Sequence, residues 1–151
     1  MPLVNFAVSG AGTGVAQTVA VKGADYVIET DAYPAFGGQD AHPSPLAYAL
    51  AALSSCNQVT AQIVAKELDI TVDAVRFDVS ADFDPTTMTT GKGTADATFQ
   101  NLVITAEVTT DATADVFERL RDEVARRCPL SVLFARADVK ITNDWTQVKP
   151  A

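Results

Sequence analysis

A long stretch without charged residues constrains the fold of this chain more than any other feature. No Asp, Glu, Lys or Arg occurs between Pro43 and Ala65. Ser44 is of the type that caps helix N-termini, and Pro45 suits the first helical position, where its missing N–H costs nothing. The pattern predicts a helix from Pro45 to about Leu68, which would be about 36 Å long.

The first part of this helix is apolar on nearly every side. Residues 46–53 are all Leu, Ala or Tyr. A helix of this kind is buried on most sides, so we expect it to pass through the middle of the structure or of a dimer. We expect no membrane span, because the purely apolar run is far shorter than the roughly 20 residues that a bilayer requires.

Shorter patterns on either side of the helix indicate strands and two further helices. Before it, glycine-punctuated alternation predicts a meander of short strands. The expected strands lie at 4–8, 15–21, 26–29, 70–83, 99–108 and from 139 onward, and the expected helices at 113–127 and 129–136. The expected inward faces are Leu102, Ile104, Ala106 and Val108 on a strand, and Phe117, Leu120 and Val124 on a helix. A change of face at Ala74–Val75 predicts a β-bulge.

The order of these elements decides the fold class. Strands precede the long helix, further strands follow it, and a helix pair separates these from the last strand. Because the elements do not alternate as βαβ units would, we predict an α+β fold. The length of 151 residues fits a single domain over 1–151.

The composition excludes several function classes. Lysine and arginine total 11 against 19 acidic residues, so the net charge is −8 at pH 7. Nucleic acids and anionic membrane surfaces attract positive charge, so we expect neither as a partner. Two cysteines are too few for a disulfide-stapled scaffold, and one histidine excludes a multi-histidine metal site within one chain. Residues 1–14 lack the features of a secretory signal, so the expected location is the cytoplasm.

The two cysteines occupy different settings. Cys56 falls inside the long helix among small side chains, where a thiol is either a small buried hydrophobe or a group that a substrate can approach. Cys128 directly precedes Pro129 and so occupies the N-cap of the following helix, whose N–H groups and dipole favour a thiolate. Arg126 and Arg127 add positive charge nearby. Alternatively, Cys128 merely continues the apolar face of the helix before it.

Two inward-facing thiols in one chain suit a specific redox reaction. A thiolate attacks the O–O bond of a peroxide and becomes a sulfenic acid, which then condenses with a second thiol. This chemistry requires two cysteines, one of them activated, and no other redox-active group, so we expect no cofactor. The sequence alone does not show whether Cys56 and Cys128 meet in space.

Two segments make the chain similar to a known family. One is GGQDAHPSPLAYALAALSSC, at Gly37–Cys56, and the other is RCPLSVLFARADVKI, at Arg127–Ile141. They resemble the motifs of the OsmC/Ohr family of osmotically induced and organic-hydroperoxide-resistance proteins, and are most similar to its general OsmC-like branch. The resemblance implies an intertwined homodimer with two active sites at the interface. In each subunit the long central helix, which carries Cys56, would pack with a second helix pair against antiparallel sheets.

The same resemblance implies an activity. It is the thiol-dependent reduction of organic hydroperoxides, with a dithiol as the final reductant. In this assignment Cys56 is the peroxidatic cysteine and Cys128 the resolving one. The helix N-cap position, by contrast, favours Cys128 as the more acidic thiol.

The chain departs from the family pattern at the activating groups. Family peroxidases usually carry a glutamate early in the long helix, where this chain has Leu46 and Ala47. That glutamate normally holds an arginine of the N-terminal hairpin against the peroxidatic sulfur, but no arginine precedes Cys56 here. A cysteine in apolar surroundings without a nearby cation has a raised pKa and reacts slowly. Either another group activates Cys56, or the peroxidase activity is weak or absent.

A few residues are candidates for this supporting role. His42 precedes the Pro-Ser-Pro segment, and Asp40 is its candidate partner. Arg136 matches the arginine of the second motif, and Arg127 precedes the second cysteine directly. The competing expectation is that the histidine is structural or on the surface, and that the arginines near the second cysteine pair with acidic neighbours on their own helix.

A hydroperoxide also requires an apolar pocket. The lining candidates, for which ordinary core packing is the alternative, are Phe36, Leu53, Phe117 and Phe134. We expect no metal, because the sequence has neither a CxxC nor an HxxxH spacing.

The sequence leaves two main hypotheses. The first is a dithiol peroxidase acting on organic hydroperoxides, which predicts Cα atoms of Cys56 and Cys128 about 5.5–6 Å apart. The second is an OsmC-like dimer without peroxidase activity that binds a small apolar ligand at the dimer interface. A purely structural dimer without a pocket is a weaker third. We prefer the first, because both cysteines match family motifs in a chain that has no others.

Overall fold

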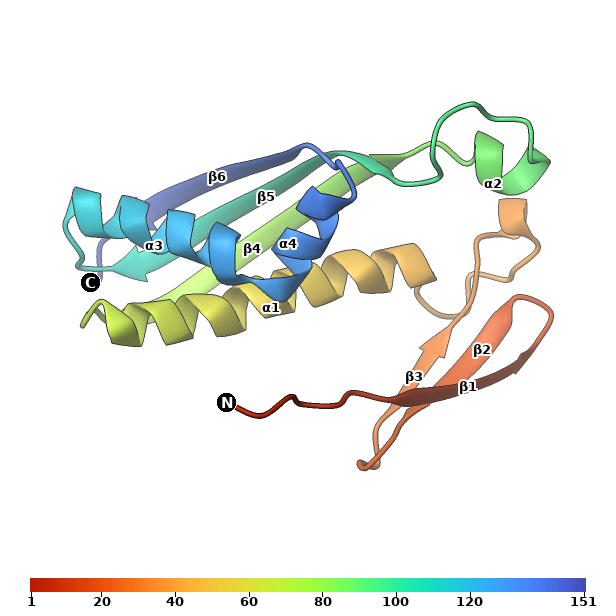
Figure 1. Cartoon of the computed structure of the whole chain (residues 1–151), viewed down its shortest axis with the longest axis horizontal. Helices are drawn as coiled ribbons and strands as arrows, with labels where there is room; N and C mark the ends of the chain where they lie inside the picture. The colour runs from red at the N-terminus through yellow and green to blue at the C-terminus, as the bar shows by residue number, and fades with distance from the viewer. The chain divides into compact units, whose positions relative to one another are not determined.

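The computed structural model describes the whole chain, from Met1 to Ala151 (Figure 1). The chain divides into two compact units, Met1–Ala49 and Leu50–Ala151, and the boundary falls inside the long helix. That residues 1–151 form a single domain stays a prediction.

The first unit holds a three-stranded antiparallel sheet in the order β1-β2-β3. The strands are β1 (Val8–Thr13), β2 (Ala16–Val21) and β3 (Val27–Thr30). The expected meander is confirmed, but a first strand at 4–8 is wrong. Gly10 and Gly12 lie within β1 instead of ending a strand before it. Gly12 is required at its position, because a Cβ there would collide with the backbone of Ala16 across the hairpin. Gly14, with φ 63°, makes the two-residue turn to β2.

The loop that follows β3 is organised by one buried carboxylate. Asp31 accepts hydrogen bonds from the backbone N–H groups of Ala32 at 2.8 Å, and of Gln39 and Ala41 at 3.0 Å. A short 3₁₀ helix, η1 (Pro34–Phe36), lies within this loop and was not expected. Asp31 is the only buried residue of the first unit, so its sheet has no apolar core of its own in the single chain.

The second unit holds a three-stranded sheet in the order β4-β5-β6. Strand β4 (Val72–Phe83) pairs antiparallel with β5 (Phe99–Thr110), and β6 (Ile141–Val148) pairs parallel with β5. The parallel pair departs from the expectation of antiparallel strands alone. It arises because two helices connect β5 to β6 and return the chain to the same end of the sheet. The register of β4 shifts near the predicted bulge, between Val72 and Ala74, and again between Ser80 and Asp82.

The helices follow the sequence pattern closely. They are α1 (Pro45–Glu67), α2 (Thr86–Thr90), α3 (Ala114–Arg127) and α4 (Pro129–Arg136), of which only α2 was not expected. The Ser44 hydroxyl accepts the N–H of Ala47 at 3.2 Å, which confirms the predicted cap. Asp69, with φ 54°, ends α1 in a left-handed turn and delays β4 beyond the predicted start at Ile70.

One face of the second unit's sheet is covered by helices, which leaves two buried clusters (Figure 1). The expected inward face of β5 is confirmed, since Leu102, Ile104, Ala106 and Val108 are all fully buried. The first cluster contains Ala61, Val64, Ala65, Val72, Ala106, Val108, Phe117, Leu120, Val124 and Trp145. The second, which we call the thiol cluster, contains Leu53, Leu102, Ile104, Cys128 and Val139, with Cys56 packed against it.

The long helix is less buried in the single chain than its composition predicts. Its inner face holds Leu53, Asn57 and Thr60, but within 46–53 only Leu53 is buried, and further along Val59 is 58% exposed and Ile63 55% exposed. The expectation of burial on most sides is therefore wrong for one chain, because the sheet and helices of the second unit cover only one side of α1. None of the helices combines the length and apolar character needed to span a bilayer.

Candidate active site

The fold brings the only two cysteines of the chain together. Cys56 lies in the middle of α1 and Cys128 at the junction of α3 and α4, and both pack in the thiol cluster. Both are free thiols, Cys128 fully buried and Cys56 partly exposed. Each thiol also shifts the pKa of the other, as neighbouring titratable groups do.

Local backbone geometry fixes the position of Cys128. Its extended conformation, φ −67° and ψ 116°, breaks the helix between α3 and α4, and Pro129 opens the next helix. The Cys128 N–H donates to the carbonyl of Val124 at 2.9 Å, and its carbonyl accepts the N–H of Val132 at 3.0 Å. The sulfur is therefore held at the N-terminal end of α4, where the helix dipole favours negative charge.

A buried amide next to Cys56 joins the two helices. Asn57 is fully buried, and its Nδ2 lies 3.0 Å from the Leu53 carbonyl, 3.2 Å from Ser131 Oγ and 3.6 Å from Cys128 Sγ. Its Oδ1 is buried without any hydrogen-bond partner. Sequence reasoning missed Asn57 and Ser131. No sequence signal marked them, because Asn57 is one of several uncharged polar residues in this part of α1.

The surroundings shift the two thiols in opposite directions. Burial raises the pKa of Cys56, and its hydrogen bond with Cys128 raises it further. Burial also opposes the charge on Cys128, but hydrogen bonds from the Ser131 hydroxyl and backbone N–H and from Cys56 outweigh it and lower the Cys128 pKa. As the pH rises, Cys128 therefore loses its proton before Cys56.

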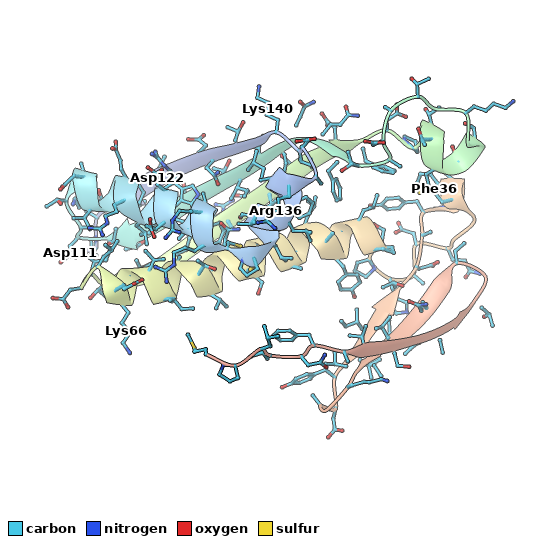
Figure 2. All side chains as sticks on the ribbon, in the orientation of Figure 1. Phe36, Lys66, Asp111, Asp122, Arg136 and Lys140 are labelled. Carbon is cyan, nitrogen blue, oxygen red and sulfur yellow. The ribbon has the colours of Figure 1, made fainter.

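The arginines that were candidates for activating Cys56 are either engaged in ion pairs or exposed. Arg127 makes ion pairs with Glu67 and, at 3.8 Å, with Glu123, and Arg126 pairs with Glu123 at 2.7 Å. Pairing with an acidic neighbour on the same helix was the competing expectation. Arg136 is exposed at the end of α4 and makes no ion pair (Figure 2).

The other supporting candidates lie in the first unit. His42 Nε2 lies 4.0 Å from a carboxylate oxygen of Glu29 in β3, and both side chains are about half exposed. Asp40 is exposed and has φ 55°, and it does not form the expected pair with His42. These two residues belong to the loop that Asp31 organises and are not in the thiol cluster.

The apolar candidates separate into three places. Leu53 belongs to the thiol cluster, and Phe134 packs against it in contact with Phe99, at a centroid distance of 5.6 Å. Phe117 belongs to the other cluster, and Phe36 is half-buried in the 3₁₀ helix of the first unit. No group of three or more His, Cys, Asp or Glu side chains is arranged to hold a metal ion.

Comparison with known proteins gives one family match and several similar structures. A family model for OsmC-like proteins matches residues 37–143. An OsmC-like protein from Mycoplasma pneumoniae superposes with a TM-score of 0.79 at 20% identity, over 96% of this chain and 98% of its own. An organic hydroperoxide resistance protein OsmC from Legionella pneumophila superposes with a TM-score of 0.72 at 16% identity, over 97% and 99%.

A further similar structure is the organic hydroperoxide resistance protein OhrB of Bacillus subtilis. It superposes with a TM-score of 0.64 at 21% identity, over 96% of this chain and all of its own. No curated protein sequence matches significantly. At these identities the likeness shows the fold, and the predicted α+β class is confirmed.

Proposed function

The chain belongs to the OsmC-like protein family, and on this basis we propose that it is a thiol-dependent peroxidase that reduces organic hydroperoxides through Cys56 and Cys128. The observation that carries the proposal is the packing of its only two cysteines in one cluster. Solved structures with the same fold include proteins named for organic hydroperoxide resistance.

Accessibility supports a division of roles between the thiols. Cys56 keeps partial exposure, whereas Cys128 has none, so Cys56 is the sulfur that a hydroperoxide reaches. The Cys56 sulfur attacks the terminal peroxide oxygen, the O–O bond breaks, and Cys56 becomes a sulfenic acid while an alcohol leaves. Cys128 then attacks the Cys56 sulfur and water leaves, which forms a disulfide that an external dithiol reduces. Leu53 and Phe134 are the candidates for contact with the organic part of the substrate.

The proposal includes a homodimer in the cytoplasm, where a dithiol pool keeps both cysteines reduced. The exposed apolar side chains of α1 support the dimer, since Val59 and Ile63 lie on the same side of the helix as Cys56. A partner subunit on this side of α1 would also border the accessible thiol.

The reaction is tested on reduced protein with a slight excess of cumene hydroperoxide. We expect rapid loss of both free thiols and an intact mass, under non-reducing conditions, lower by two hydrogens. The Cys56→Ser variant should abolish hydroperoxide consumption. Two free thiols and an unchanged mass after prolonged exposure would contradict the peroxidase.

A second candidate function has one observation in its favour. The raised pKa of Cys56 and the absence of an adjacent cation describe a thiol of low reactivity. If the thiols prove inert, the alternative is an OsmC-like dimer that binds a small apolar ligand at its interface. Native mass spectrometry of the purified dimer would then reveal a bound compound by its additional mass.

A further inference from the structure

Access and charge favour different thiols in this site. Cys56 is the partly exposed thiol, but hydrogen bonds from Leu130 and Thr60 do not outweigh the effect of burial on its pKa, whereas at the buried Cys128 the hydrogen bonds prevail. A simple peroxidatic cysteine would be both reachable and ionised, and neither thiol meets both conditions alone. A mechanism for this pair has to connect a reachable sulfur with a charge held on its neighbour.

Asn57 is placed to hold that charge on Cys128. Its Nδ2 points from α1 across to α4, 3.6 Å from Cys128 Sγ and 3.2 Å from Ser131 Oγ. The two N–H hydrogens of the amide are shared by these two acceptors and the Leu53 carbonyl at 3.0 Å, and the Cys128 sulfur attracts one of them more strongly as a thiolate than as a thiol. The fully buried amide keeps this position although its Oδ1 finds no partner, which costs folding stability.

Ser131 and the start of α4 act in the same direction. The Ser131 hydroxyl and backbone N–H lower the pKa of Cys128, and the backbone of Leu130 adds a smaller contribution. None of these donors carries a full charge, and the two thiols are the titratable groups that act on each other here. Neutral hydrogen-bond donors from α1 and α4 therefore stabilise the thiolate here, as a nearby cation does for other reactive cysteines.

We infer that Asn57 and Ser131 hold the negative charge of the reduced pair on Cys128, and that the Cys128 thiolate takes the proton of Cys56 as Cys56 attacks the hydroperoxide. This inference rests on the proposed peroxidase function. Cys128 acts first as a general base and later as the resolving thiol. Asn57 is a positioning residue, because it acts on the reaction through Cys128.

The steps balance in protons and electrons. The Cys56 proton passes to Cys128 while the Cys56 sulfur bonds to the terminal oxygen and the O–O bond breaks. Cys56 becomes a sulfenic acid, oxidised by two electrons, and the alkoxide takes the proton back from Cys128 to leave as alcohol. Cys128, again a thiolate, attacks the Cys56 sulfur, the S–S bond forms, and the departing hydroxide takes a proton from solvent.

The position of the charge is measured without any peroxide. In reduced protein labelled with ¹³C at the cysteine Cβ atoms, NMR resolves the titration of each thiol. We expect Cys128 to titrate at lower pH than Cys56, and Asn57→Leu to move the Cys128 titration to higher pH. Ser131→Ala should do the same, which covers the case in which the first variant fails to fold. Titration of Cys56 first, or an unmoved Cys128 in both variants, would overturn the charge assignment.

A matched control lies one turn along α1. Thr60 is buried and donates from Oγ1 to the Cys56 carbonyl at 2.8 Å, so it contacts Cys56 instead of Cys128. Thr60→Val removes a hydroxyl that lowers the pKa of Cys56, so it should move the Cys56 titration to higher pH and move the Cys128 titration less than Asn57→Leu does. An equal shift of the Cys128 titration in this variant would mean that any buried polar deletion moves Cys128, which would overturn the role of Asn57.

The general-base role is tested on the first chemical step alone. The release of cumyl alcohol from cumene hydroperoxide is followed over a single turnover in wild type and in Cys128→Ser and Cys128→Ala, and dimedone identifies the sulfenic acid on Cys56 in the two variants, where no resolving thiol removes it. A purely resolving Cys128 would leave this rate unchanged. We expect it to fall at least about tenfold at pH 7 in both variants, and the deficit to shrink as Cys56 ionises at higher pH.

The two possible failures are distinguishable. If wild type consumes cumene hydroperoxide and both Cys128 variants release cumyl alcohol at the wild-type rate, the general-base role is wrong and the peroxidase stands. If wild type consumes none, the peroxidase and the base role fall together, and the NMR titration still decides where the charge lies.

Discussion

At the scale of single residues, Asp31 ties the stability of the first unit to pH. Its pKa is lowered by hydrogen bonds from the N–H groups of Ala41 and Ala32, against the opposing effect of desolvation. A lowered folded-state pKa gives stability that is present above the unfolded pKa, about 3.9, and lost as the pH falls through the folded value. We expect Asp31→Asn to lower the urea midpoint at pH 7, and the difference to shrink towards pH 2.5.

The control for this prediction is Asp40→Asn in the same loop. Asp40 is exposed with φ 55°, a conformation that asparagine also tolerates, so the urea midpoint should hardly change. An Asp31→Asn deficit that stays constant from pH 7 to pH 2.5 would contradict the argument from the carboxylate charge.

Part of the candidate site could be predicted from residue types alone. Cys56 and Cys128 stand out as the only thiols, and the N-cap position of Cys128 predicts its lower pKa. Asn57 and Ser131 could not be predicted, because their role depends on contact between α1 and α4, which lie far apart in sequence. An asparagine after a cysteine carries no signal until the second helix is in place.

At the scale of elements, the cap of α1 makes a measurable contribution. Ser44 Oγ accepts the N–H of Ala47 at 3.2 Å at the start of the helix that carries Cys56. We expect Ser44→Ala to lower the free energy of unfolding by about 1 kcal/mol, measured by chemical denaturation. The control, Ser55→Ala, replaces an exposed serine inside the same helix with a better helix former, so it should not destabilise. Equal losses in both variants would contradict a capping role.

Element boundaries were predictable where a local chemical signal marks them. Pro45 and Pro129 each open a helix where expected, because proline fixes the first helical turn. The first strand was misplaced because its glycines indicate a break from sequence alone, whereas Gly12 permits close approach across the hairpin. The parallel pairing of β6 follows from the path of two intervening helices, which no strand pattern contains.

At the scale of the whole molecule, exposed apolar surface favours association of the chain with a second copy. The sheet of the first unit has no buried apolar residue, and the preceding segment exposes Leu3, at 103%, and Phe6, at 90%. A three-stranded sheet needs a packed hydrophobic face to be stable. In the second unit, α1 exposes Val59 and Ile63. The composition of α1 predicts that the helix is buried. Packing of a second copy of the chain against its exposed side would bury it.

These exposed apolar side chains predict a dimer that a single charge on α1 weakens. Analytical ultracentrifugation should find the wild type dimeric at micromolar concentration. Ile63→Lys would bury an unpaired ammonium in the interface, so the dissociation constant should rise at least about tenfold, or roughly 1.4 kcal/mol. Met88→Lys is the control, because it charges an equally exposed apolar side chain on the short helix α2. A monomeric wild type, or an equal effect of both substitutions, would contradict an interface on this side of α1.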